Sequence, residues 1–88
     1  MIFEWDENKA DKNERKHGVS FEEAESVFYD PRSFTIPDPG QSDTELRFID
    51  IGTSNYDRIL VVVYTEREDR IRLISARPAS RKERKLYE

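Results

Sequence analysis

The chain contains no cysteine, and histidine, tryptophan and methionine occur once each. The absence of cysteine excludes disulfides and thiolate metal sites, and a single histidine argues against a transition-metal site. Glycine is scarce as well, and Gly18, Gly40 and Gly52 are spaced too widely for a phosphate-binding loop. We therefore expect no metal and no cofactor.

Long apolar segments are also missing. No stretch approaches the length needed to span a membrane, and the opening MIFEWDENK lacks the basic start and apolar run of a signal peptide. These absences predict a soluble, cytoplasmic protein without membrane contact. Hydrophobic residues make up 35% of the 88 residues, so residues 1–88 are expected to form a single domain with a small core, supplied by aromatic residues and the apolar run Ile59–Tyr64.

Charge is abundant, and its two signs are segregated along the chain. The formal net charge is −4, yet seven of the fifteen basic residues lie between Arg70 and Lys85, where Glu83 is the one acid. Residues 18–69 carry a net charge of −8 and residues 70–88 one of +5. This segregation predicts a local anion-binding face on an otherwise acidic protein.

The first third of the chain predicts a strand and two helices. Ile2–Trp5 alternates weakly, as a short strand does. Asp6 is suited to cap a helix over Glu7–His17, and Gly18 is suited to end it. That helix is polar almost all round, so neighbouring elements must hold it in place.

A second helix is predicted to begin at Ser20. Glu23 three residues later completes a capping box, and Asp30 followed by proline ends the helix. Its apolar stripe should face a sheet and consists of Phe21, Ala24, Val27 and Phe28.

Four strands are predicted to follow, with a polar loop that reaches about Thr44 after the first of them. The most apolar of the four is expected to be central. In the last strand, strict alternation would put Ile71, Leu73 and Ser75 on one face and the intervening residues on the other. The predicted strands are Ser33–Ile36, Leu46–Thr53, Arg58–Thr65 (central) and Arg70–Ala76.

Ser80, with Glu83 as its capping-box partner, is predicted to begin a short C-terminal helix. The order β-α-α-β-β-β-β-α predicts an α+β fold: a small antiparallel β-sheet with two N-terminal helices packed on it and a short C-terminal helix.

The basic C-terminal segment is the first candidate for function. Arginine suits bidentate contact with phosphate and stays charged, so a strand followed by a basic helix can form a phosphate cradle. The alternative is a solvated surface whose arginines pair with the acidic middle of the chain. The residues concerned are Arg72, Arg77, Arg81 and Arg84.

A second cluster surrounds the single histidine. His17 ends the first predicted helix, where the helix dipole favours the imidazolium, and histidine is the usual side chain for proton transfer near neutral pH. Lys9 and Lys16 share its side of the helix, and Lys12 lies close by. The alternative is a structural histidine on a solvated helix.

Other acid–base candidates have structural alternatives too. Tyr64 ends the core strand and is expected to be buried, Glu83 can serve only to close its capping box, and Tyr87 can pin the terminal helix. The acidic residues Asp38, Asp43 and Glu45 lack the spacing of a calcium loop.

Taken together, several segments resemble the BrnT family along the whole chain. They are Phe3-Glu4-Trp5-Asp6 with Lys9 and Asn13, Lys16-His17-Gly18-Val19-Ser20-Phe21-Glu22-Glu23-Ala24, Pro37-Asp38-Pro39, Ile59–Thr65 with Glu66-Arg67, and Ile74-Ser75-Ala76-Arg77-Pro78-Ala79 with Glu83-Arg84 and Tyr87-Glu88. BrnT proteins are ribonuclease toxins of type II toxin–antitoxin systems with a RelE-like fold. Many relatives carry histidine where this chain has Tyr64.

The resemblance implies metal-independent RNA cleavage that inhibits translation. It also implies a BrnA-like ribbon-helix-helix antitoxin, which would join two toxins in a heterotetramer and alone contact operator DNA. In this interpretation Arg77 stabilises the phosphorane, His17 with Lys16 transfers protons, and Tyr87 and Glu83 are reserves. The remaining RNA-binding residues would be Lys9, Lys12, Arg72, Arg81 and Arg84.

Two alternatives from other functional classes use the same basic face. A non-catalytic nucleic-acid-binding module would bind RNA or DNA with a steep salt dependence and without strand scission. A protein-interaction domain would dock an acidic segment of a partner on that face.

Overall fold

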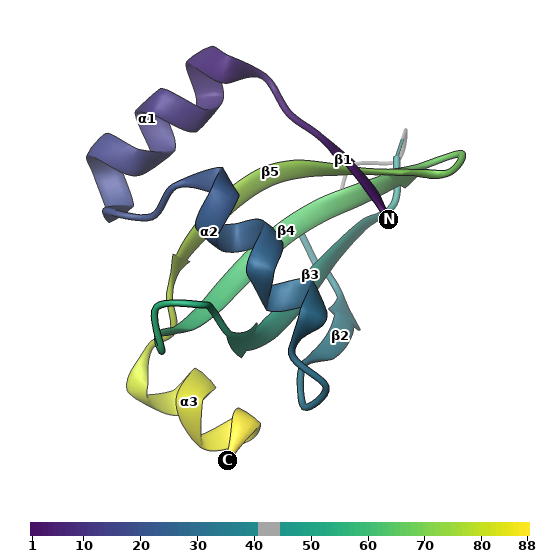
Figure 1. Ribbon diagram of the computed structural model, residues 1–88. Coiled ribbons are helices and arrows are strands. Elements are labelled where there is room, and N and C mark those ends of the chain that lie inside the picture. Colours follow the sequence, from purple (N-terminus) through teal and green to yellow (C-terminus); the bar gives the residue numbers. More distant parts are fainter. Residues whose placement is uncertain (41–44) are drawn as a thin grey trace.

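The computed structural model describes residues 1–40 and 45–88, in which three α-helices, one 3₁₀ turn and five strands form an α+β fold (Figure 1). The α+β prediction and the order of elements are confirmed. Asp43 and Thr44 of the predicted loop lie outside the described residues. The elements are β1 (Ile2–Glu4), α1 (Glu7–His17), α2 (Phe21–Ser26), η1 (Val27–Tyr29), β2 (Phe34–Pro37), β3 (Arg47–Thr53), β4 (Ile59–Arg67), β5 (Arg70–Pro78) and α3 (Arg81–Tyr87).

The predicted helix caps are formed, with one exception. The Asp6 carboxylate accepts the first free amides of α1, and Gly18 ends that helix at φ 71°. Ser80 and Glu83 form a complete capping box at α3. At α2, Ser20 accepts the Glu23 amide, but the Glu23 side chain turns away to other partners. The second half of that predicted capping box is therefore wrong.

The sheet has the strand order β1-β5-β4-β3-β2, which confirms β4 as its central strand. Pairing is antiparallel except between β1 and β5, which run parallel. The wholly antiparallel prediction is wrong at this edge because the long chain between the two strands imposes no hairpin geometry. Since β1 pairs only with residues 70–72, no strand of residues 1–40 and 45–88 pairs with the β1-side edge of β5 beyond Arg72.

A β-bulge changes the pattern of the last strand. Val63 pairs with Ser75 and the next residue, Tyr64, pairs with Leu73, so Ile74 is the extra residue. Leu73 therefore faces the core together with Ala76, and the predicted alternation fails beyond the bulge. The bulge puts Ser75 and Arg77 on the same side of the sheet as Arg72, away from the core.

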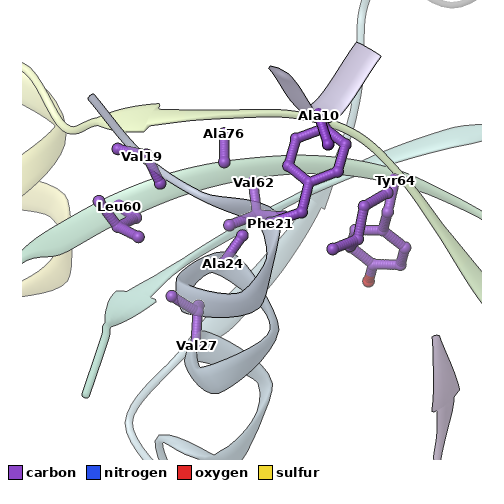
Figure 2. Close-up of a cluster of buried hydrophobic side chains, with 10 residues drawn as sticks. Ala10, Val19, Phe21, Ala24, Val27, Leu60, Val62, Tyr64 and Ala76 are labelled. Atoms are coloured by element: carbon purple, nitrogen blue, oxygen red, sulfur yellow. The ribbon is translucent and has the colours of Figure 1, made fainter. Parts of the chain in front are cut away.

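The core lies between the sheet and the two N-terminal helices (Figure 2). Phe21, Ala24 and Val27 are fully buried, which confirms the apolar stripe of the second helix, and Phe28 packs edge-on against the Tyr64 ring at 4.9 Å between centroids. We call the side of the sheet away from α2 the open face. Helix α3, near the C-terminus of the chain, is anchored against β3 at one end of the open face (Figure 1).

Candidate nucleic-acid interface

Helix α1 is fixed against the edge of β5 by one buried side chain. The amide nitrogen of Asn13 donates to the carbonyls of Ala76 at 2.8 Å and Val19 at 3.0 Å, and its oxygen accepts the Ala76 amide at 3.1 Å. These bonds satisfy backbone groups that a neighbouring strand would otherwise pair. A polar helix is thus held by polar contacts, as its composition requires.

The seam between α1 and β5 forms a basic groove. It is lined by Lys9, Lys12, Asn13, Lys16, His17, Ile74 and Ser75, and we call it the lysine groove. The four candidate site residues of the first helix, Lys9, Lys12, Lys16 and His17, therefore lie together. The acidic residues of α1 do not line this groove.

A second hollow adjoins the lysine groove on the open face. Arg47, Thr65 and Arg72 stand in one row across three neighbouring strands, because Thr65 pairs with both arginines. Lys9, Glu45, Arg67 and Ile74 complete the lining, and we call it the Glu45 hollow. The two depressions share Lys9 and Ile74, so they form one continuous basic strip.

Glu45 is the one carboxylate that lines this hollow in the described part of the chain. Its oxygens accept from the Arg67 guanidinium at 2.8 Å and 3.2 Å. The Arg67 hydrogen bonds, supported by the charges of Arg67 and Arg72, lower the pKa of Glu45 although partial burial opposes them. Glu45 is therefore an ionised acceptor at neutral pH, surrounded by cations.

Other carboxylates hold the arginines at the rim. Arg72 donates to Glu4 at 3.0 Å, and Arg47 pairs with Asp38 at 3.2 Å. The Arg72 hydrogen bond lowers the pKa of Glu4. These pairs orient the guanidinium groups, and the remaining N–H donors of Arg72 can contact an anion.

Arg77, the first-choice cation from the sequence, has its guanidinium engaged within the protein. It donates to both oxygens of Glu83 at 2.8 Å and 2.7 Å. These bonds lower the pKa of Glu83 to about 2, so Glu83 stays ionised at neutral pH. Arg81 and Arg84 lie exposed on α3 and do not line the strip.

The two candidate tyrosines have structural contacts. The Tyr87 hydroxyl donates to Asp30 at 2.5 Å and accepts from Thr53 at 2.9 Å, which pins α3 to the sheet as one prediction had it. Tyr64 is 5% exposed in the core, where burial raises the pKa of its hydroxyl. Neither hydroxyl lines the basic strip.

The sequence patterns thus predicted the residues of the lysine groove and Arg72 but not most of the Glu45 hollow. Glu45 was weighed only for a calcium loop, whose spacing it lacks, and Arg47, Thr65 and Arg67 were not predicted as site residues. The signal that could have found them is the register of the β3–β4 hairpin, which sets Arg47 opposite Thr65. Among residues 1–40 and 45–88, no group of three or more histidine, aspartate or glutamate side chains could hold a metal ion. No helix in the described ranges is long and apolar enough to cross a membrane.

The chain was compared with known proteins. The sequence profile of a family described as "Ribonuclease toxin, BrnT, of type II toxin-antitoxin system" matches residues 5–83. The 1.1 Å crystal structure of the Brucella abortus ribonuclease toxin BrnT aligns with a TM-score of 0.66 at 27% identity, and the alignment covers 92% of this chain and 100% of that one. No curated protein matches the sequence.

Proposed function

The chain belongs to the BrnT family of ribonuclease toxins of type II toxin–antitoxin systems, and on that premise we propose that it cleaves RNA without a metal ion and thereby inhibits translation. The observation that carries the proposal is the continuous basic strip, in which Lys9, Arg67 and Arg72 surround the ionised Glu45. A carboxylate among cations suits attack by a ribose 2′-hydroxyl on the adjacent phosphate.

In the proposed reaction Glu45 accepts the proton of the 2′-hydroxyl, whose oxygen forms a bond to phosphorus. Arg67 and Arg72 stabilise the charge of the phosphorane. The bond to the 5′-oxygen then breaks, and that oxygen receives a proton. We assign this proton to Lys9, because the guanidinium groups of the hollow do not deprotonate in proteins.

His17 receives a different role in this proposal. Lys9 and His17 are eight residues apart on α1, which corresponds to about 12 Å along the helix axis. That separation exceeds the reach of two groups acting on one phosphate, so we propose that His17 and Lys16 bind the flanking nucleotide. For Arg77 we propose a role in holding α3 through Glu83.

The proposal is tested by RNA cleavage with purified protein in excess chelator. Wild type should cleave, and Glu45→Gln should lose roughly 10²-fold or more in rate, the size of a lost general base. Glu22→Gln, an exposed change on α2, is the matched control and should cleave as wild type does. Arg77→Ala and His17→Ala test the roles that the sequence alone assigned to these residues.

Each outcome separates the alternatives. Full activity in Glu45→Gln would overturn the role of Glu45 while leaving the ribonuclease in place. If folded wild type cuts no RNA, with or without ribosomes, but binds it with a steep salt dependence, the non-catalytic binding module is the better interpretation.

As a toxin of such a system the protein has an antitoxin partner and an RNA substrate. We propose, from the family resemblance, that the antitoxin is a BrnA-like ribbon-helix-helix protein whose dimer joins two toxins in a heterotetramer and supplies all contacts with operator DNA. Light scattering of the purified complex tests the stoichiometry, and a mass corresponding to one toxin and one antitoxin would contradict it.

A further inference from the structure

The open face of the sheet carries an apolar row that the basic strip does not explain. Ile36, Ile49 and Val63 are consecutive cross-strand partners on β2, β3 and β4, and Ser75 continues the row onto β5. Ile36 is 38% exposed at the sheet edge, and Ile49 and Val63 are half-buried. We call this row the apolar trough.

Different structures border the trough on its two sides. On one side, the next side chains on the same face of the sheet are Arg47, Thr65 and Arg72. On the other side, the next side chains on this face are Ile51 and Val61. Each is 2% exposed, at the end of the sheet where α3 is anchored. The β5 end of the trough opens into the lysine groove at Ser75.

We propose that the apolar trough binds an acidic amphipathic helix of the antitoxin, an inference that rests on the proposed toxin function. An aliphatic floor suits a protein better than RNA, because bases stack on aromatic side chains and arginine planes. The bordering guanidinium groups complement carboxylates on one flank of such a helix.

The spacing of the trough fits a helix lying across the strands. Two strand intervals of roughly 4.8 Å separate Ile36 from Val63. Side chains at i, i+3 or i+4, and i+7 of a helix span about 10 Å with similar steps. An extended peptide, with same-face side chains about 7 Å apart, would fall out of register.

The proposal also explains how the antitoxin would neutralise the toxin. A helix in the trough would set its carboxylates against Arg47 and Arg72, at the mouth of the Glu45 hollow. RNA and the antitoxin would then compete for Arg47 and Arg72. RNA would otherwise occupy the basic strip, whereas the antitoxin helix would occupy the apolar trough.

The test compares two charges at one position. The affinity of the purified toxin for its antitoxin is measured by calorimetry for wild type, Ile36→Glu and Ile36→Lys, alongside RNA cleavage. Ile36→Glu should weaken binding by about tenfold or more through lost apolar contact and repulsion. Ile36→Lys should weaken it several-fold less, since its stem still covers apolar surface and its charge attracts carboxylates. Tyr56→Glu, at a residue 69% exposed in the turn before β4, is the control and should bind as wild type does.

The outcomes distinguish this inference from the function on which it rests. Wild-type antitoxin affinity in Ile36→Glu would overturn the trough as the binding site. An equal loss of affinity in Ile36→Glu and Ile36→Lys would overturn the acidic character of the partner. Neither result would affect the proposed RNA cleavage. Slower RNA cleavage with unchanged antitoxin affinity would make the trough part of the RNA path and overturn the inference. If wild type neither cleaves RNA nor binds the antitoxin, the proposed function itself fails. Thermal unfolding of each variant verifies that it is folded.

Discussion

Asn13 offers the sharpest test of how α1 is held on the sheet. The side chain is 7% exposed and makes three hydrogen bonds to backbone groups of Ala76 and Val19. Asn13→Ala removes all three and leaves the backbone donor and acceptors without these partners. At roughly 1 kcal/mol per net hydrogen bond, the free energy of unfolding should fall by about 3 kcal/mol.

The assay is urea unfolding, with a control on the same helix. Alanine favours helix more than asparagine by roughly half a kcal/mol, which would mask part of the loss. Asn8→Ala makes the same chemical change at an exposed position of α1 and reports that offset. At about 4–8 °C per kcal/mol for a domain of this size, the melting temperature of Asn13→Ala should fall by roughly 12–24 °C.

A difference below about 1 kcal/mol between Asn13→Ala and Asn8→Ala would refute the argument that Asn13 seals the β5 edge. A second consequence concerns RNA. Under conditions where Asn13→Ala is folded, RNA affinity should fall, because the lysine groove depends on the position of α1.

Three further outcomes follow from single contacts. Burial raises the pKa of Asp50 to about 6, above its ordinary value of 3.8. The stability contributed by the protonated carboxyl is therefore present below about pH 4 and is lost as the pH rises through 6. Asp50→Asn should thus raise the free energy of unfolding by up to about 3 kcal/mol at pH 7 and hardly at pH 4, as measured by urea unfolding at both pH values. Tyr87→Phe deletes the hydroxyl between Asp30 and Thr53 and should cost about 1–3 kcal/mol in the same assay; no loss would mean that α3 is held by its other contacts. Lys16→Gln should reduce the slope of log RNA affinity against log salt by about one, and an unchanged slope would remove Lys16 from the interface.

Local signals in the sequence predicted the local structure well. Asp6, Gly18 and Ser80 act on backbone groups within a few residues, so their roles as caps could be predicted without knowledge of the fold. The central place of β4 could also be predicted, because its run of apolar residues can be buried only inside a sheet.

Features that depend on distant partners were not predictable in the same way. Glu23 fits a capping box in the sequence, yet its buried carboxylate pairs with Arg58, 35 residues away. The bulge at Ile74 is defined by the pairing of β5 with β4, and no local residue signals it. Glu45 contacts Arg67 because of the β3–β4 register, so the Glu45 hollow could not be predicted without knowledge of the strand pairing.

The shortness of β1 links these features to the proposed site. A β1 long enough to pair all of β5 would satisfy the Ala76 backbone and leave no place for Asn13, so a helix as polar as α1 would have little to hold it. Because β1 ends at Glu4, α1 takes the place of a strand along the second half of β5 and brings its lysines beside the arginine row. The lysines of α1 and the arginines of β3, β4 and β5 thereby meet in one strip. A protein with a net charge of −4 can in this way present a continuous cationic strip to an anion.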